Sequence, residues 1–135
     1  MKKIRISAIA VLAGVLSASA LEVHFFQHGE TTWERATVVQ GSIPYVRLTL
    51  QGERMAQETA EGMKSANVRY DRIYASDLLR AQRTAEIVAD VQGVRPIVDA
   101  RLRDMGMGKY EGVRYSKGDY PDDNLKPVSL VHGGI

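Results

Sequence analysis

His28 is the residue of this chain whose type and position point most directly to chemistry. It is followed by Gly29 and comes after residues 21–26, an apolar run with the length of one strand. A neutral imidazole is a competent nucleophile toward a phosphoryl group and can carry that group as a covalent intermediate. The alternative is a loop histidine that only forms a hydrogen bond. Taken alone, the pair His28-Gly29 favours this second interpretation.

Arg80 is a second candidate, because it lies in the first turns of a predicted helix that follows a predicted strand. A guanidinium at that place can hold a phosphate through two parallel hydrogen bonds, and the helix N-terminus adds positive potential. The alternative is a solvated surface arginine, which is also the simpler interpretation of Arg83.

Short apolar runs alternate with helical patterns along the chain, and these elements must position the candidate residues. Strands are predicted at residues 21–26, 71–74, 96–98 and 128–131, and residues 31–47 are predicted to be loop and irregular structure. Strands that alternate with helices predict an α/β fold whose sheet is mostly parallel. Such sheets carry their functional loops at the carboxyl ends of the strands, where His28 and Arg80 are expected.

The first long helix is predicted to begin after Thr49 as N-cap and to continue to about residue 64. Met55, Thr59 and Met63 recur at helical spacing and are predicted to form its inner face, with Ala56 and Ala60 beside them.

The second long helix is predicted to be capped by Ser76 or Asp77 and to end at Gly93. Its predicted inner face consists of Ala81, Ala85 and Val88.

The N-terminus has the pattern of a secretory signal peptide. Basic residues at positions 2, 3 and 5 precede an apolar stretch at 6–16, and Ala18-Ser19-Ala20 has the form of a cleavage site. We expect residues 1–20 to be removed, and residues 21–135 to form one exported domain, periplasmic or secreted, without a stable membrane span. The alternatives are an uncleaved anchor or a buried strand.

Composition narrows the possible functions. The chain has 135 residues, of which 44% are hydrophobic and 25% charged, as in an ordinary globular domain. It contains no cysteine, which excludes disulfides, thiolate metal sites and a cysteine nucleophile. Its formal net charge of +2 depends on the three basic residues of the leader. No dense basic patch remains without them, which argues against nucleic acid as a partner.

Residues 25–33 resemble the R-H-G-E-T-x-W-N signature of the histidine phosphatases, the superfamily that includes the cofactor-dependent phosphoglycerate mutases. Three further stretches follow in the family's order. The four matching stretches are FFQHGETTW (25–33), YASDLLRAQRTA (74–85), DARLRDMGMGKYEG (99–112) and VSLVHGGI (128–135). The resemblance implies a phosphoglycerate mutase-like, three-layer α/β fold with helices on both faces of the sheet.

The resemblance also implies phosphomonoester hydrolysis through a phosphohistidine on His28. In that scheme Arg80 holds the phosphate, Asp104 protonates the leaving oxygen and His132 steadies the phosphoryl group. An aspartate can do this general acid work, although Asp104 could also be a surface carboxylate paired with Arg101 or Arg103. Further phosphate contacts are implied for Gln27, Gly29, Thr31 and Gly41.

The resemblance further implies a structural role for Glu111 and a small phosphorylated substrate. No metal or organic cofactor is implied. A phosphatase is favoured over a mutase, because an exported protein would rarely meet glycolytic substrates.

The sequence departs from the family pattern at two phosphate contacts and near its end. Gln27 stands where the family has arginine, and Glu34 where it has asparagine, so the pocket loses one positive charge and gains a negative one. Phosphoryl transfer depends on positioning and charge stabilisation. His132 also follows Glu111 without the family's long insert, so its match could be due to chance. The alternative function is therefore a weakened or inactive relative that binds a phosphorylated ligand or a protein partner.

Overall fold

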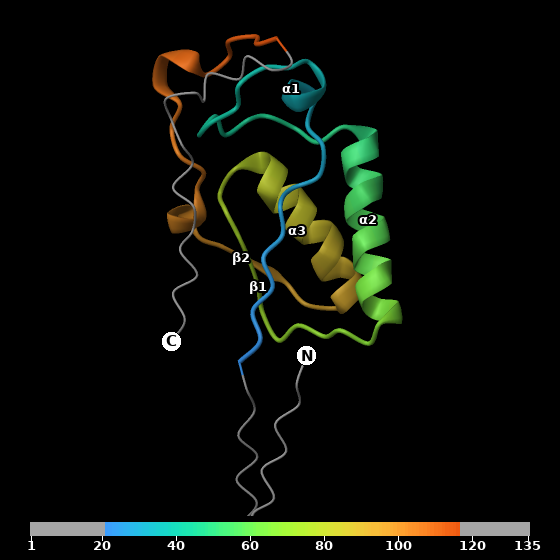
Figure 1. Ribbon diagram of the computed structural model, residues 1–135. Helices are drawn as coiled ribbons and strands as arrows, with labels where there is room; N and C mark the ends of the chain where they lie inside the picture. Colours follow the sequence, from blue (N-terminus) through green and yellow to red (C-terminus); the bar gives the residue numbers. More distant parts are fainter. Residues whose placement is uncertain (1–20, 117–135) are drawn as a thin grey trace, which may run out of the picture.

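A strand, a helix and a second strand form the centre of the structure, a computed structural model that describes residues 21–116 (Figure 1). The predicted leader, the run at 128–131 and His132 lie outside these residues. The described elements are α1 (Thr32–Arg35), α2 (Leu50–Ser65), β1 (Ile73–Ala75), α3 (Leu79–Gln92), β2 (Pro96–Val98) and the 3-10 helices η1 (Ala100–Leu102) and η2 (Gly108–Tyr110).

Strands β1 and β2 pair in parallel, with Ile73 opposite Pro96 and Ala75 opposite Val98. Helix α3 connects them and packs on both strands, as parallel neighbours joined by a crossover helix require. The strands predicted at 71–74 and 96–98 are thus present, and the first is shifted by one or two residues toward the C-terminus. The chain beyond β1 leads directly into the segment that holds Arg80.

Helix α2 begins and ends where its sequence signals predict. The hydroxyl oxygen of Thr49 accepts a hydrogen bond from the backbone N–H of Gly52 at 2.9 Å, which satisfies one of the free donors of the first turn. At the other end Asn67 adopts a left-handed conformation with φ 57°. The N–H of Asn67 then donates to the carbonyl oxygen of Lys64, and that of Val68 donates to the carbonyl oxygen of Met63. This is the hydrogen-bond pattern of a Schellman motif.

Helix α2 packs on α3, and its buried residues are small ones rather than the predicted Met55 and Thr59. Gly52, Ala56 and Ala60 are buried, whereas Met55 is 45% exposed and Thr59 is exposed as well. The predicted face is therefore wrong at Met55 and Thr59, whereas Met63 is half-buried and the accompanying Ala56 and Ala60 are buried. Gly52 lies against the turn after His28, because a Cβ at this position would be 2.1 Å from the carbonyl oxygen of Glu30.

Helix α3 buries Ala85 and Val88 as predicted, while Ala81 is only half-buried. Gly93 ends the helix in a left-handed conformation with φ 72°. The predicted cap at the start is wrong, because the N-cap residue is Leu78 and no side chain caps the helix there. Ser76 accepts a hydrogen bond from the backbone N–H of Leu78 instead, at 3.2 Å.

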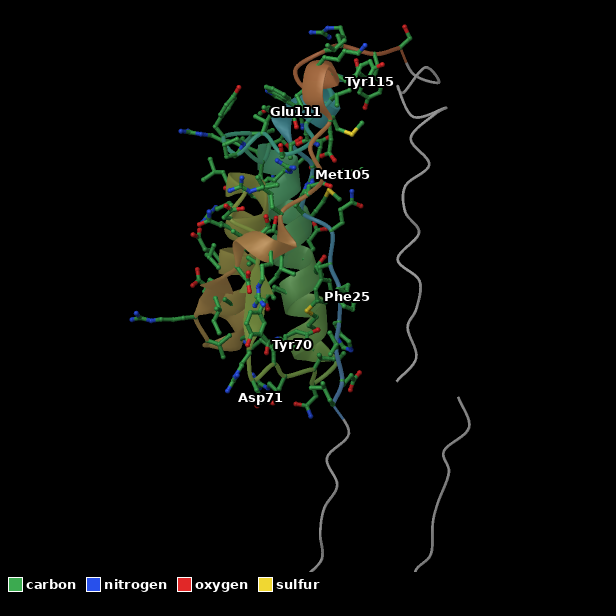
Figure 2. All side chains as sticks on the ribbon, turned by 90° about the vertical axis from the view of Figure 1, so that its left-hand side faces the viewer. Phe25, Tyr70, Asp71, Met105, Glu111 and Tyr115 are labelled. Carbon is green, nitrogen blue, oxygen red and sulfur yellow. The ribbon has the colours of Figure 1, made fainter. Side chains whose placement is uncertain are left out.

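Residues 21–27 are extended but do not form the predicted strand. Their side chains are exposed, and Phe25, 88% exposed, lies at the outer edge of the molecule in Figure 2. A strand needs a neighbour for its backbone ladder, and no described segment pairs with this one. A side-chain contact fastens it, since His24 Nδ1 lies 2.5 Å from the Tyr70 hydroxyl.

The expected loop at 31–47 contains one short helix, α1. Its first turn carries a capping box in which the Thr31 hydroxyl accepts from Glu34 N–H, and the Glu34 carboxylate accepts from Thr31 N–H. This T-x-x-E pattern is visible in the sequence, and it explains why the segment is helical here.

Between residues 21 and 116, no helix is long and apolar enough to cross a membrane.

Candidate active site

A backbone contact determines which nitrogen of His28 is free. The ring is half-buried, and its Nδ1 lies 2.9 Å from the carbonyl oxygen of Gly29. A carbonyl oxygen only accepts hydrogen bonds, so we assign the hydrogen to Nδ1, which donates it. In the neutral ring the lone pair is then on Nε2, the nitrogen that is free to attack an electrophile.

The turn after His28 is fixed against both long helices. The N–H of Gly29 donates to the Thr84 hydroxyl oxygen at 3.1 Å, and this hydroxyl donates to the carbonyl oxygen of Arg80 at 2.8 Å. Gly29 also lies directly on helix α2, because a Cβ at this position would be 2.3 Å from the carbonyl oxygen of Gly52. The close approach requires glycine and holds the histidine turn at a defined distance from Arg80.

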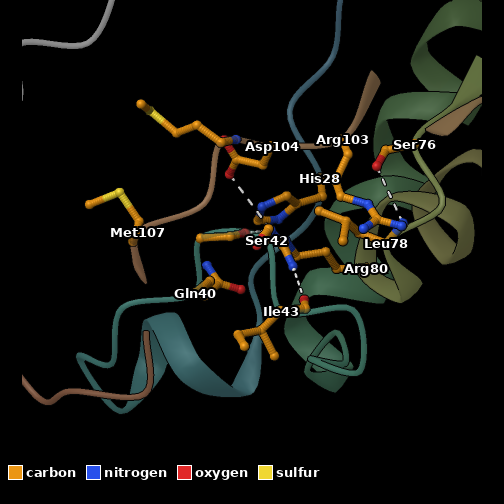
Figure 3. A network of polar contacts seen from close by, with 12 residues as sticks. His28, Gln40, Ser42, Ile43, Ser76, Leu78, Arg80, Arg103, Asp104 and Met107 are labelled. Carbon is orange, nitrogen blue, oxygen red and sulfur yellow. Dashed lines mark hydrogen bonds and ion pairs between the residues drawn. The ribbon is translucent and has the colours of Figure 1, made fainter. Parts of the chain in front are cut away.

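Arg80 is a buried residue whose guanidinium is oriented by backbone carbonyls (Figure 3). Its side chain is 1% exposed, its Nη1 donates to the Ile43 carbonyl oxygen at 2.9 Å, and its Nη2 donates to that of Gly41 at 2.7 Å. Among the described residues, Nε has no hydrogen-bond partner although it is buried. An unsatisfied donor on a buried guanidinium requires an explanation, and the positive charge favours an anion as its partner.

The environment of Arg80 contains charges of both signs. Burial lowers the pKa of its guanidinium, while the nearby carboxylates of Asp104 and Glu34 act in the opposite direction. Arginine remains protonated under such conditions. Arg83, one turn further along α3, is exposed and donates to Glu53 at 2.7 Å. The surface-arginine interpretation therefore fits Arg83 and does not fit Arg80.

Asp104 lies at the exposed edge of the same cluster. Its Oδ2 is 3.6 Å from Arg80 Nη2, and its Oδ1 accepts from the backbone N–H of Met105 at 2.8 Å. The side chain is 58% exposed, and Figure 3 shows it near both His28 and Arg80. This placement leaves the carboxyl group accessible to a substrate that contacts Arg80.

Both arginines near Asp104 pair with other carboxylates. Arg101 Nη2 lies 2.5 Å from Asp99 Oδ2, and the hydrogen bonds from Arg101 lower the pKa of Asp99 to about 2. Arg103 Nε donates to Asp77 Oδ1 at 2.9 Å, and its Nη2 donates to Asp77 Oδ2. Asp104 is thus an exposed carboxylate, as the alternative expected, but its ion pair is with Arg80 and the predicted pairing with Arg101 or Arg103 is wrong.

Glu111 holds the loop that presents Gly41. Its Oε1 accepts from Ser42 N–H at 2.7 Å, from the Ser42 hydroxyl at 2.9 Å and from Met107 N–H at 3.0 Å. These hydrogen bonds, with that from Met107 first, lower the pKa of the Glu111 carboxyl. Gly41 contacts Arg80 through its carbonyl oxygen, which accepts from Nη2 and orients the guanidinium. Glu111 thus has the structural position expected of it.

Thr31 and Glu34 are engaged with one another and with Gln40. The buried Thr31 donates its hydroxyl hydrogen to Gln40 Oε1 at 2.8 Å, and its N–H donates to Glu34 Oε2 at 2.8 Å. The Glu34 carboxylate is therefore held against a backbone donor. This contact reduces the repulsion toward a phosphate that the sequence suggested for Glu34.

Gln27 is exposed beside His28, at the border of a hollow whose other walls include Met55, Thr59 and Thr84. It can offer an amide N–H₂ group to an anion but no charge. The roles predicted for Gln27, Gly29, Thr31 and Gly41 in phosphate binding remain predictions, as does that of His132.

Three residues of this site were not singled out from the sequence. Gln40 and Ile43 orient Thr31 and Arg80, and Thr84 connects Arg80 with the turn after His28. Thr84 could have been found, since it belongs to the matching stretch 74–85. Ile43 acts through its carbonyl oxygen, which every residue has, so no sequence signal marks it.

In the part of the chain that the structure covers, no group of three or more His, Asp or Glu side chains could hold a metal ion.

The sequence and the fold place the chain in a known class of proteins. Residues 23–125 match the sequence profile of the Histidine phosphatase superfamily (branch 1), and the chain belongs to this family. Among its curated relatives, the probable phosphoglycerate mutase GpmB of Erwinia tasmaniensis is 38% identical over 91 residues, which is 67% of this chain and 41% of the relative. The protein of the same name from Escherichia coli O1:K1 / APEC is 40% identical over 115 residues, 85% of this chain and 52% of the relative. The chain thus spans about half the length of these relatives.

Solved structures confirm the α/β, phosphoglycerate mutase-like fold class. A mycobacterial glucosyl-3-phosphoglycerate phosphatase in complex with VO3 superposes with a TM-score of 0.62 and 29% identity, over 73% of this chain and 48% of that one. The phosphoserine phosphatase of Entamoeba histolytica in complex with 3-phosphoglyceric acid has a TM-score of 0.57 and 28% identity, over 70% of this chain and 47% of that one. The two-stranded sheet with α3 on it is the part of this fold that residues 21–116 contain.

Proposed function

We propose that this protein is a phosphomonoesterase that acts through a phosphohistidine on Nε2 of His28. The observation that carries the proposal is the hydrogen bond between His28 Nδ1 and Gly29, next to a buried Arg80 with an unpaired Nε. The hydrogen bond to Gly29 leaves Nε2 of His28 as the nucleophilic nitrogen. The guanidinium of Arg80, whose Nε is unpaired, provides a donor for an anion. The family's named members include phosphoglycerate mutases and phosphatases, and both kinds of enzyme transfer a phosphoryl group.

The reaction proceeds in two steps that balance with water as the only co-substrate. Nε2 of His28 attacks phosphorus, the P–O bond to the leaving group breaks, and the Asp104 carboxyl gives its proton to the departing oxygen. Water then attacks phosphorus while the Asp104 carboxylate takes its proton. The P–N bond to His28 breaks, its electron pair returns to Nε2, and inorganic phosphate is released. Arg80 stabilises the phosphoryl oxygens in both steps.

The substrate we propose is a small phosphorylated metabolite. The names of the solved relatives refer to glucosyl-3-phosphoglycerate and phosphoserine, and one of these proteins holds 3-phosphoglyceric acid. Arg80 contributes a single recessed guanidinium, which suits one phosphoryl group. We further propose that residues 1–20 export the protein, since their pattern is that of a leader.

A second candidate function is binding without turnover. It is favoured by Gln27 and Glu34, because Gln27 provides no charge beside His28 and Glu34 adds a carboxylate to the surroundings of Arg80. Such a protein would hold a phosphorylated ligand on Arg80 and fail to stabilise the transition state.

The test is hydrolysis of an aryl phosphate by the purified chain, combined with acid quench to trap an acid-labile phosphoryl group on the protein. We expect turnover and a labelled protein, both lost in His28→Ala. His24→Ala is the matched control, because His24 is exposed on the same segment and contacts Tyr70 instead. A folded chain that binds orthovanadate and hydrolyses nothing would support the binding function.

A further inference from the structure

Asp77 and Arg103 join the start of helix α3 to the loop that carries Asp104. Arg103 donates from Nε and Nη2 to the two carboxylate oxygens of Asp77, so the pair forms a fork of two parallel hydrogen bonds. Each partner favours the charged form of the other, which lowers the pKa of Asp77 and raises that of Arg103. A fork of this kind fixes direction as well as distance.

The loop around Asp104 has little else to hold it. Residues 103–106 belong to no helix or strand and are exposed. The bond between Asp104 and Met105 N–H is local to the loop, and the ion pair with Arg80 is long at 3.6 Å. The next side-chain anchor described along the chain is the bond from Met107 N–H to Glu111. The fork therefore fixes the backbone one residue before the carboxyl group.

The exposure of Asp77 and Arg103 separates two possible effects of their ion pair, which are positioning of Asp104 and stabilisation of the fold. The Arg103 side chain is 46% exposed and that of Asp77 is 23% exposed. Ion pairs in contact with solvent add little to folding stability, because their attraction is screened and their side chains lose freedom. An effect of the fork should thus be found in the geometry of Asp104 and hardly in the stability of the fold.

We propose that Asp77 and Arg103 are positioning residues that aim the carboxyl group of Asp104 at the leaving oxygen. The inference rests on the proposed function for its catalytic consequence. Arg103 bonds to Asp77 and in this way sets the position of Asp104 beside Arg80. The side chains of the fork need no contact with the substrate.

The leaving group of the substrate provides the test. A nitrophenolate ion leaves without a proton, whereas an alkyl oxygen needs the general acid. In Arg103→Lys, which keeps the charge and loses the fork, we expect kcat/KM for an alkyl phosphate to fall by about 10-fold or more. For nitrophenyl phosphate we expect a change of less than about 2-fold, because that step does not depend on the acid. Inhibition by inorganic phosphate and the melting temperature should remain unchanged, and Asp77→Asn should behave in the same way.

Arg101→Lys is the matched control, since Nε and Nη2 of Arg101 donate to the two carboxylate oxygens of Asp99 in a similar fork that does not reach α3. Arg101→Lys should leave kcat/KM unchanged for both the alkyl phosphate and nitrophenyl phosphate. Equal losses on both substrates, or an equal loss in Arg101→Lys, would overturn the inference.

Nuclear magnetic resonance separates this inference from the proposed function. In Arg103→Lys we expect the backbone order parameters of Asp104 and Met105 to fall, with no change in Arg101→Lys. If the chain hydrolyses neither substrate, the proposed function fails, and the order parameters alone decide whether the fork holds the loop. Unchanged order parameters would sink the positioning role.

Discussion

Nη2 of Arg80 donates to the carbonyl oxygen of Gly41 at 2.7 Å and lies 3.6 Å from Oδ2 of Asp104. One guanidinium nitrogen thus links a loop before α2 with a loop after β2. The backbone contact is the shorter, so Arg80 is oriented by the fold before any ligand arrives. Asp104 is close enough to Arg80 to interact with its positive charge, and it is exposed to solvent. In the proposed reaction, Arg80 stabilises the phosphoryl oxygens and Asp104 protonates the leaving oxygen.

Replacement of Arg80 by methionine should destabilise the fold as well as the site. The carbonyl oxygens of Gly41 and Ile43 would lose their donors, and an unsatisfied buried polar group costs about 1–3 kcal/mol. We expect urea unfolding of Arg80→Met to show a free energy lower by about 2–4 kcal/mol.

Arg83→Met is the control on the same helix. Arg83 is exposed and bonds only to other side chains, so its loss should change the free energy of unfolding by less than about 1 kcal/mol. Equal losses in the two variants would show that the carbonyl contacts of Arg80 have no special weight.

Glu111 should make the stability of the protein depend on pH. Its folded-state pKa lies below the ordinary value of 4.5, because three donors stabilise the carboxylate. Stabilisation by such a group is present above the unfolded pKa and is lost as pH falls through the lowered folded pKa. The urea midpoint of Glu111→Gln should therefore be lower near neutral pH and approach that of the wild type in acid.

Glu58→Gln, an exposed change on α2, is the control for Glu111. It should leave the curve of midpoint against pH unaltered. If Glu111→Gln instead runs parallel to the wild type over the whole range, the carboxylate contributes nothing through its charge.

Local patterns predicted the elements of this fold better than they predicted its contacts. Thr49 as N-cap, Gly93 as terminator and the parallel strands follow from short-range signals, and all are present. The strand at residues 21–26 was wrong because strand formation depends on a neighbour, which no local pattern contains. Helix α1 was missed although its T-x-x-E capping box is local, because Glu34 was considered only as a replaced phosphate contact.

The candidate site shows the same limit. The motifs indicate His28, Arg80 and Asp104, and in the structure Asp104 lies 3.6 Å from Arg80 with His28 near both in Figure 3. The buried guanidinium of Arg80 is satisfied by the carbonyl oxygens of residues 41 and 43. Every residue has a carbonyl oxygen, so the sequence does not show which residues will accept these hydrogen bonds. The packing of α2 through Gly52 likewise depends on how close two backbones come, which hydrophobic periodicity does not measure.

The uncharged Gln27 should limit activity. An arginine beside His28 would add a charged donor for the phosphoryl oxygens, and one well-placed donor is worth on the order of 100-fold in rate. We expect Gln27→Arg to raise kcat/KM for nitrophenyl phosphate by about 10- to 100-fold. Gln57→Arg, on the exposed side of α2, adds the same charge away from His28 and should have no effect. A Gln27→Arg variant no faster than the wild type would show that the missing charge is not what limits the rate.

Gly52 and Gly62 lie on the same helix and should respond in opposite ways to alanine. A Cβ at Gly52 would lie 2.1 Å from the carbonyl oxygen of Glu30, so the turn after His28 must move to accommodate it. A Cβ at Gly62 would meet nothing within 4 Å. Alanine in an open helical position stabilises by about 0.5–1 kcal/mol, whereas overpacking costs about 1–3 kcal/mol.

We therefore expect Gly62→Ala to raise the melting temperature, and Gly52→Ala to lower it and to shift the nuclear magnetic resonance signals of His28 and Gly29. The comparison removes helix propensity as an explanation, since both variants gain it equally. A Gly52→Ala protein as stable as Gly62→Ala would contradict the close approach of α2 to the histidine turn. A loss of stability together with a displaced His28 signal would show that α2 sets the position of the proposed nucleophile.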